Sequence, residues 1–141
     1  MRRGIPLLVR LAQQSADERR GDLGQIARAS SDAAAALNQH DATAASEADR
    51  ALADPDARAS LEGWTLHASR GRTQLRQRAT ELDRSELAAR EALREAIVRT
   101  KQLEFALATI QAEHRRAAAR RIDQQADERE LTRHTPVKTR Q

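Results

Sequence analysis

The sequence predicts an all-α protein: two long antiparallel helices that form a coiled-coil hairpin, with the second helix longer and overhanging the first. Three observations predict this fold. An apolar residue recurs at every seventh position of the second half, and a single proline interrupts the chain near its middle. The 141 residues also include only one Trp, one Phe and no Tyr, so the large side chains that fill a globular core are missing.

The heptad row of the second half is the strongest signal. A strict period of seven keeps an apolar row on one side of a long helix only when the helix supercoils around a partner, and a disordered chain has no need of such a register. The nine members of this row are Leu61, Ala68, Leu75, Leu82, Ala89, Ala96, Leu103, Ile110 and Ala117.

The three prolines divide the chain into two intervals that can be helical. We expect helices over residues 5–52 and 56–132. Pro6 suits the first turn of the first helix, where its missing amide hydrogen costs nothing. The helices form a single domain, residues 1–134. Residues 135–141, around Pro136, show no periodicity and are expected to form a flexible C-terminal tail.

A chain reversal is expected near residues 53–56. Asp54 can cap a new helix, Pro55 suits its first position, and Asp56 favours the positive end of the helix dipole. A reversal centred here places three sets of residues opposite each other: Ala45 with Trp64, Leu23 with Glu86 and Leu87, and His40 with Ser69.

The first helix has a weaker heptad row of its own. Many positions in both rows are alanine, which buries little apolar area, so the hairpin is expected to be only marginally stable without a partner. The row consists of Val9, Ala16, Leu23, Ser30, Leu37, Ala44 and Ala51, beside a companion row of Ile5, Ala12, Ile26 and Ala33.

The end of the second helix should project about 30 Å or more past the first. This overhang, residues 110–132, loses its apolar row after Ala117. A charged helix without its hairpin partner is either frayed or docked on another molecule. If it is docked, arginine side chains on successive turns would meet an acidic protein surface. These candidate binding residues are Arg115, Arg116, Arg120 and Arg121.

The sequence favours a non-enzyme that has no cofactor and no metal. The four histidines, His40, His67, His114 and His134, share no metal-binding motif, and two helices form no concave pocket for a nucleophile. No phosphate-binding loop is present either.

The two aromatic side chains have different expected roles. Trp64 follows Leu61 by three residues and is expected to plug the hairpin beside the turn. Phe105 occupies an outward-facing heptad position, where it is either idle or an exposed anchor for a partner.

Charge and the absence of cysteine limit the location and the partners. The net charge is +4, but 25 basic residues are interleaved with 21 acidic ones, which is typical of a solvated helix surface with pairs such as Glu86–Arg90 and Glu95–Arg99. A chain without cysteine fits the reducing cytoplasm. Arg10 ends the apolar opening too early for a signal peptide, and no apolar run is long enough to span a membrane.

Three segments, residues 5–12 (IPLLVRLA), 101–104 (KQLE) and 120–128 (RRIDQQADE), together with the hairpin pattern, resemble the FliJ family of flagellar export proteins. The resemblance covers nearly the whole length. It implies an antiparallel helical hairpin, as in the related stalk proteins of type III secretion, that associates from the cytoplasm with the export apparatus of a flagellum or an injectisome.

The same resemblance implies two protein partners. The end that carries both termini would enter a hexameric export ATPase, so Arg115, Arg116, Arg120, Arg121, Asp123 and Gln124 would face the ring. Trp64 and His67, near the turn, would approach the membrane-bound export gate. Export chaperones are further candidate partners. Residues 40–48 lack the aromatic side chains that family members often carry for the gate.

Two other functions fit the pattern. The Arg-rich C-terminal part suits a basic nucleic-acid-binding protein, although it also contains acidic residues and no aromatic residue for base stacking. A generic coiled-coil scaffold that dimerises through the overhang is the other alternative.

Overall fold

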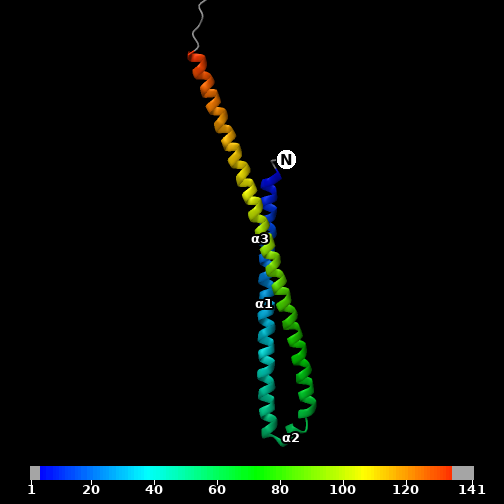
Figure 1. Cartoon of the computed structure of the whole chain (residues 1–141). Coiled ribbons are helices and arrows are strands. Elements are labelled where there is room, and N and C mark those ends of the chain that lie inside the picture. The colour runs from blue at the N-terminus through cyan, green and yellow to red at the C-terminus, as the bar shows by residue number, and fades with distance from the viewer. Residues whose placement is uncertain (1–3, 135–141) are drawn as a thin grey trace, which may run out of the picture.

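The computed structural model describes residues 4–134. Within this range the chain forms three helices and no strand: α1 (Gly4–Ala53), α2 (Pro55–Arg58) and α3 (Leu61–His134). The two long helices run in opposite directions along each other, and α2 joins them at one end of a rod (Figure 1). The predicted all-α class is confirmed for these residues. The tail predicted for residues 135–141 lies outside the described range.

The contact between α1 and α3 follows the two heptad rows. All nine members of the α3 row are half-buried, in a helix whose other residues are mostly exposed. The α1 row and its companion supply the buried apolar residues, and four of these five are alanine: Val9, Ala12, Ala16, Ala33 and Ala51. The core is therefore a single thin layer of small side chains, as the alanine-rich rows predicted.

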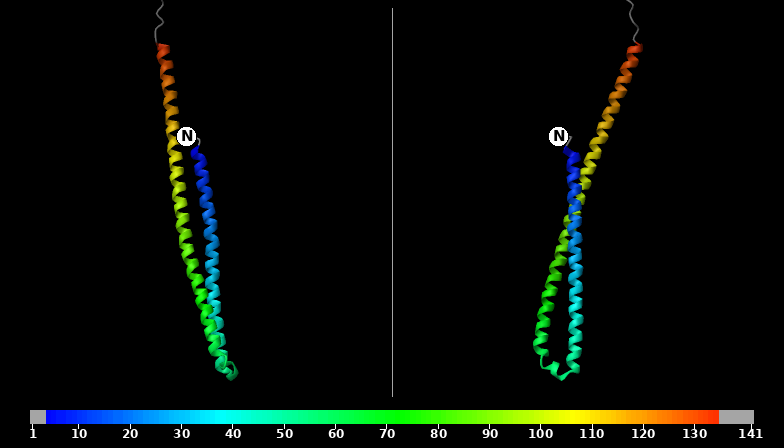
Figure 2. Two further views of the ribbon diagram at one scale, coloured as in Figure 1. Left: turned by 90° about the vertical axis from the view of Figure 1, so that its right-hand side faces the viewer. Right: turned by 180° about the vertical axis from the view of Figure 1, so that it is seen from behind.

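The two long helices also change their relative position along the rod. In Figure 1 a gap between α1 and α3 is visible near α2. In the perpendicular view on the left of Figure 2 the gap is visible near the N-terminus instead. Helices that cross at a shallow angle in this way can keep one apolar row in contact over many turns.

The reversal is built by the residues that predicted it. The carboxylate of Asp54 accepts a hydrogen bond from the amide of Asp56 at 3.0 Å, and Pro55 is the first residue of α2. Arg58, at the end of α2, donates to the carbonyl of Leu52 at 2.9 Å. This bond ties α2 back to the end of α1.

The predicted start of the second helix was wrong. Asp54 caps only the short helix α2, the chain turns again at residues 59–60, and α3 begins at Leu61. The physical reason is that the axes of packed helices lie about 8–10 Å apart, a distance that a single cap does not span. The short helix bridges this distance.

The extra turn also shifts the register, so the predicted opposite pairs were wrong. Ala45 is exposed, and Trp64 instead lines a cleft with Ala51. Cross-helix hydrogen bonds join Ser30 to Asp83 at 2.9 Å and Arg72 to Asp41 at 2.9 Å. Each partner lies about one helical turn further along α3 than expected.

Between residues 4 and 134, neither long helix contains a segment apolar enough to span a membrane. This agrees with the sequence, in which charged residues interrupt every apolar run.

Candidate functional site

The open end of the rod is the most exposed part of the protein. There α3 extends past the N-terminal end of α1 (Figures 1 and 2), and every residue from Ala118 to His134 is exposed. Ile110 and Ala117 are still half-buried. The exposed run therefore begins later than the predicted start at residue 110, because the register shift carries the end of α1 further along α3.

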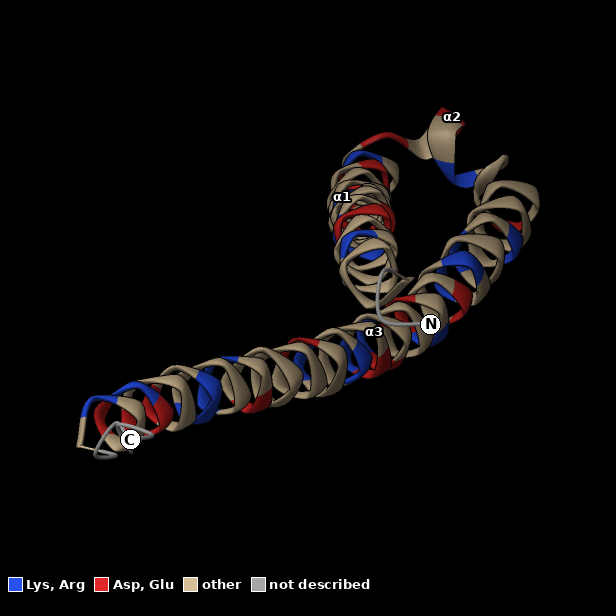
Figure 3. Ribbon diagram, turned by 90° about the horizontal axis from the view of Figure 1, so that it is seen from above, with Lys and Arg blue, Asp and Glu red and all other residues tan. Residues whose placement is uncertain are grey.

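The structure brings the predicted ATPase-binding residues together on this overhang. None of their charged side chains makes an ion pair within residues 4–134, and charged residues of both signs continue to the free end of α3 (Figure 3). The exposed set is Arg115, Arg116, Arg120, Arg121, Asp123 and Gln124.

Charged side chains in the paired part of the rod behave differently. Arg90 forms the predicted ion pair with Glu86 at 2.7 Å, and Arg20 pairs with Asp17 at 2.8 Å. The predicted pair between Glu95 and Arg99 is not among the ion pairs of residues 4–134. The paired region therefore satisfies several of its charges internally, whereas the overhang leaves its arginines available.

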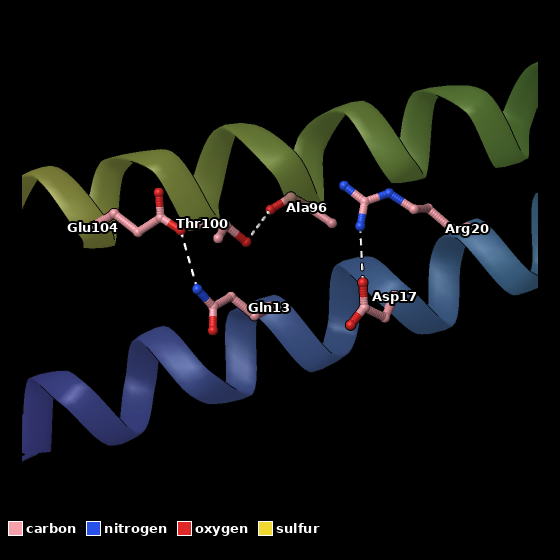
Figure 4. A network of polar contacts seen from close by, with 6 residues as sticks. All are labelled: Gln13, Asp17, Arg20, Ala96, Thr100 and Glu104. Carbon is pink, nitrogen blue, oxygen red and sulfur yellow. Dashed lines mark hydrogen bonds and ion pairs between the residues drawn. The ribbon is translucent and has the colours of Figure 1, made fainter.

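A polar contact lies near the boundary between these two regions (Figure 4). Gln13 of α1 donates to the carboxylate of Glu104 at 3.1 Å, and Lys101 pairs with the same carboxylate at 3.3 Å. The hydrogen bond from Gln13, and then that from Lys101, lowers the pKa of Glu104 below its ordinary value. Nearby, the buried hydroxyl of Thr100 donates to the carbonyl of Ala96 at 2.8 Å. These bonds satisfy polar groups beside the last turns of the paired region.

Exposed apolar side chains also gather at the open end. Phe105 is 75% exposed, so its predicted outward position is confirmed. Leu7, Leu8 and Leu11, near the start of α1, are also about half exposed. Sequence reasoning missed these leucines, although their position outside the heptad row was the available signal. Exposed large apolar residues beside a charged surface are typical of a protein-binding region.

The opposite end contains the two residues expected at the gate. Trp64 is half-buried and lines a cleft of about 460 Å³ between the end of α1 and the start of α3, together with Arg50, Ala51 and Leu61. His67 is exposed one turn further along. The structure therefore places the half-buried Trp64 beside the turn, where the sequence predicted a plug.

A cross-helix polar cluster in the lower half of the rod was not predicted. The guanidinium of Arg72 donates to Asp41 at 2.9 Å, and this hydrogen bond is the main reason that the pKa of Asp41 is lowered. His40 packs against Gly71, where an added Cβ would lie 3.1 Å from the imidazole Nε2. In this cluster a glycine provides the space for an inward histidine, a relation that a single sequence does not reveal.

Across the described helices, no group of three or more His, Cys, Asp or Glu side chains is arranged to hold a metal ion. No protein family, curated protein or solved structure gave a significant match to the chain. The candidate site therefore depends on geometry and charge alone: an exposed arginine-rich helix end beside exposed leucines.

Proposed function

We propose that this protein is a coiled-coil hairpin that acts as the central stalk of a flagellar or type III protein export apparatus. It is not an enzyme; it works in the cytoplasm, at the membrane-bound export machinery. Its overhang binds the hexameric export ATPase and promotes assembly of the ring, and the turn end contacts the export gate. The crossing of α1 and α3 and their half-buried heptad rows support the coiled-coil part of this proposal.

One observation carries the functional part: the end of α3 is exposed on all sides, and its four arginines make no ion pair with any residue that the structure describes. A single helix is narrow, about 10–12 Å across with its side chains, so it can enter a central opening that a globular domain cannot enter. Exposed leucines at the start of α1 would add apolar contact where the rod widens to two helices. This combination suits a stalk.

A stalk of this kind acts by contacting the subunits of a ring unequally. A single rod cannot present the same surface to six subunits, so some subunit conformations receive more contact energy than others. A difference in contact energy is what shifts an equilibrium between conformations. The guanidinium groups supply this difference in contact energy through charged hydrogen bonds to acidic groups of the ring.

The turn end is the proposed contact with the export gate. Trp64 and His67 lie there, at the far end of the rod from the overhang, so both contacts can form at once. The partly exposed indole of Trp64 is suited to anchor a protein contact because it combines a large apolar ring with a polar N–H group.

The test measures ATP hydrolysis and binding by the export ATPase of the same organism, with and without the purified chain. Replacement of Arg115, Arg116, Arg120 and Arg121 with Ala should remove the stimulation and weaken binding about tenfold or more, because each lost guanidinium leaves an acidic partner unpaired. Circular dichroism should still report a helical protein, since these four side chains are exposed.

A matched control removes the same charge from the paired part of the rod. Four arginines there are exposed and make no ion pair in the described structure: Arg70, Arg78, Arg94 and Arg99. Their replacement with Ala should leave the stimulation intact. Equal stimulation by the overhang variant and the parent protein would contradict the proposal, and equal loss in both variants would attribute the effect to net charge.

A further inference from the structure

The charges of the overhang are ordered along the helix. Arg116 and Arg120 come first, and Asp123, Asp127 and Glu130 follow. At 3.6 residues per turn these five side chains fall within a sector of roughly 80°, so they form one stripe along one side of α3. We call this the charge stripe. It is basic in its first half and acidic in its second half.

A short apolar strip lies directly beside the charge stripe. Ala119, Ile122 and Ala126 share one face of α3 at intervals of three and four residues, and all three are exposed. Ile122 is 66% exposed, although isoleucine is usually found in protein cores. At about 100° per residue, the strip lies on the side of α3 opposite the heptad row that ends at Ala117. It therefore faces away from the row that contacts α1.

From these two features we infer that the overhang pairs with the overhang of a second copy of this chain in the antiparallel direction. A stripe that changes sign at its middle is complementary to itself only when it is reversed. A two-fold axis beside Ile122 and Asp123 brings Arg116 and Arg120 of each stripe to Glu130 and Asp127 of the other, and it leaves the two Asp123 carboxylates next to each other at the axis. The symmetric contact uses the same surface on both copies.

The register of the pair follows from the position of the axis. Arg116 lies opposite Glu130, Arg120 lies opposite Asp127, and Ala119 lies opposite Ala126, while the two Ile122 side chains meet at the axis. Because the helices are antiparallel, the two charge stripes fall on the same side of the apolar strip, which allows both kinds of contact together. A parallel pair would place the two charge stripes on opposite sides of the apolar strip, where they gain no ion pairs.

This inference goes beyond the proposed function and does not depend on it. The pair uses Arg116 and Arg120, which the proposed ATPase contact also uses, so the two complexes exclude each other. A self-paired overhang would be the form of the protein before it enters a ring. The small side chains and the short overlap limit the apolar area buried, so the pair is weak enough to be displaced by a larger interface.

The mass of the full chain in solution tests the pairing. Sedimentation equilibrium over a range of concentrations should show 15.7 kDa monomers in equilibrium with species of twice that mass, and salt should shift the equilibrium toward monomer. The double variant R116E/R120E and the triple variant D123R/D127R/E130R should each lose the dimer. A mixture of the two variants should regain it, because one stripe is then acidic throughout the exchanged region and the other basic.

The variant with all five changes separates this mechanism from a folding defect. It reverses the order of charges within one stripe, so it is again complementary to itself and should dimerise alone. The control R70E/R78E changes the same number of arginines in the paired part of the rod and should dimerise like the parent protein. A parent chain that stays monomeric, or a dimer insensitive to R116E/R120E, would overturn the inference.

Single cysteines report the direction of pairing, because the natural sequence has none. Under a mild oxidant, I122C should form a disulfide-linked dimer, since the two copies of residue 122 meet at the axis. A112C should not, because its two copies lie about 30 Å apart in an antiparallel pair. Equal cross-linking of both variants would show a parallel pair and contradict the proposed direction.

Discussion

The paired rod and the overhang are parts of one continuous helix, α3, yet they have opposite surroundings. In the paired rod the heptad row from Leu61 to Ala117 is half-buried against α1. In the overhang every residue after Ala117 is exposed, and the next position of the row is Gln124. The apolar row thus ends where its partner helix ends. The difference teaches that the sequence specifies two properties: which residues are helical, and over what length the two helices pack against each other.

The largest expected effect comes from a charge placed in the thin core. Ala33 is only 6% exposed, so Ala33→Asp would bury a carboxylate between the helices and destabilise the fold by about 3 kcal/mol. Ala118→Asp makes the same chemical change on the exposed overhang and should alter stability by less than about 0.5 kcal/mol. Urea unfolding followed by circular dichroism measures both variants. Similar destabilisation by the two changes would show that the overhang is packed in solution.

The helical architecture could be predicted from the sequence because it depends on repeated local signals. Seven-residue spacing, the absence of proline over long intervals and the cap at Asp54 each act on nearby residues. The register could not be predicted as well. It depends on how the chain crosses between two helices, and the second turn at residues 59–60 carries no strong signal in the sequence.

The candidate site likewise has features that the sequence predicted and features that it did not. The exposure of Phe105 followed from its outward-facing heptad position, and that of the arginines at 115–121 followed from the end of the heptad row; both signals are visible in the sequence. The contact between His40 and Gly71 was hidden, because it joins residues from different helices through the shifted register. Pairwise fits across an interface depend on three-dimensional positions that one helix alone does not determine.

An intermediate effect is expected at two glycines of the paired rod. Gly21 lies inside α1 with open space around it, so Gly21→Ala should stabilise the protein by about 1 kcal/mol through helix propensity. Gly71→Ala should stabilise it less, because the new methyl group would meet the His40 imidazole at 3.1 Å. Thermal unfolding of both variants checks the difference.

A double-mutant cycle attributes this difference to the histidine. In a His40→Ala background, Gly71→Ala should recover the full gain, whereas Gly21→Ala should gain the same in both backgrounds. Equal gains for Gly71→Ala with and without His40 would show that the imidazole moves aside at no cost. The contact would then have no role in fixing the register of the two helices.

The smallest expected effect is the response of the paired rod to acid. The hydrogen bond from Arg72 lowers the pKa of Asp41, so this carboxylate binds a proton less readily in the folded chain than in the unfolded chain. Its stabilising contribution is therefore complete above the unfolded pKa and is lost as the pH falls below about 4, through the lower folded pKa. Because the pair is exposed, the change is small. Asp41→Asn should flatten the acid limb of a plot of unfolding free energy against pH. A steeper limb for Asp41→Asn would reverse the sign of this linkage and show that Arg72 does not bridge the two helices in solution.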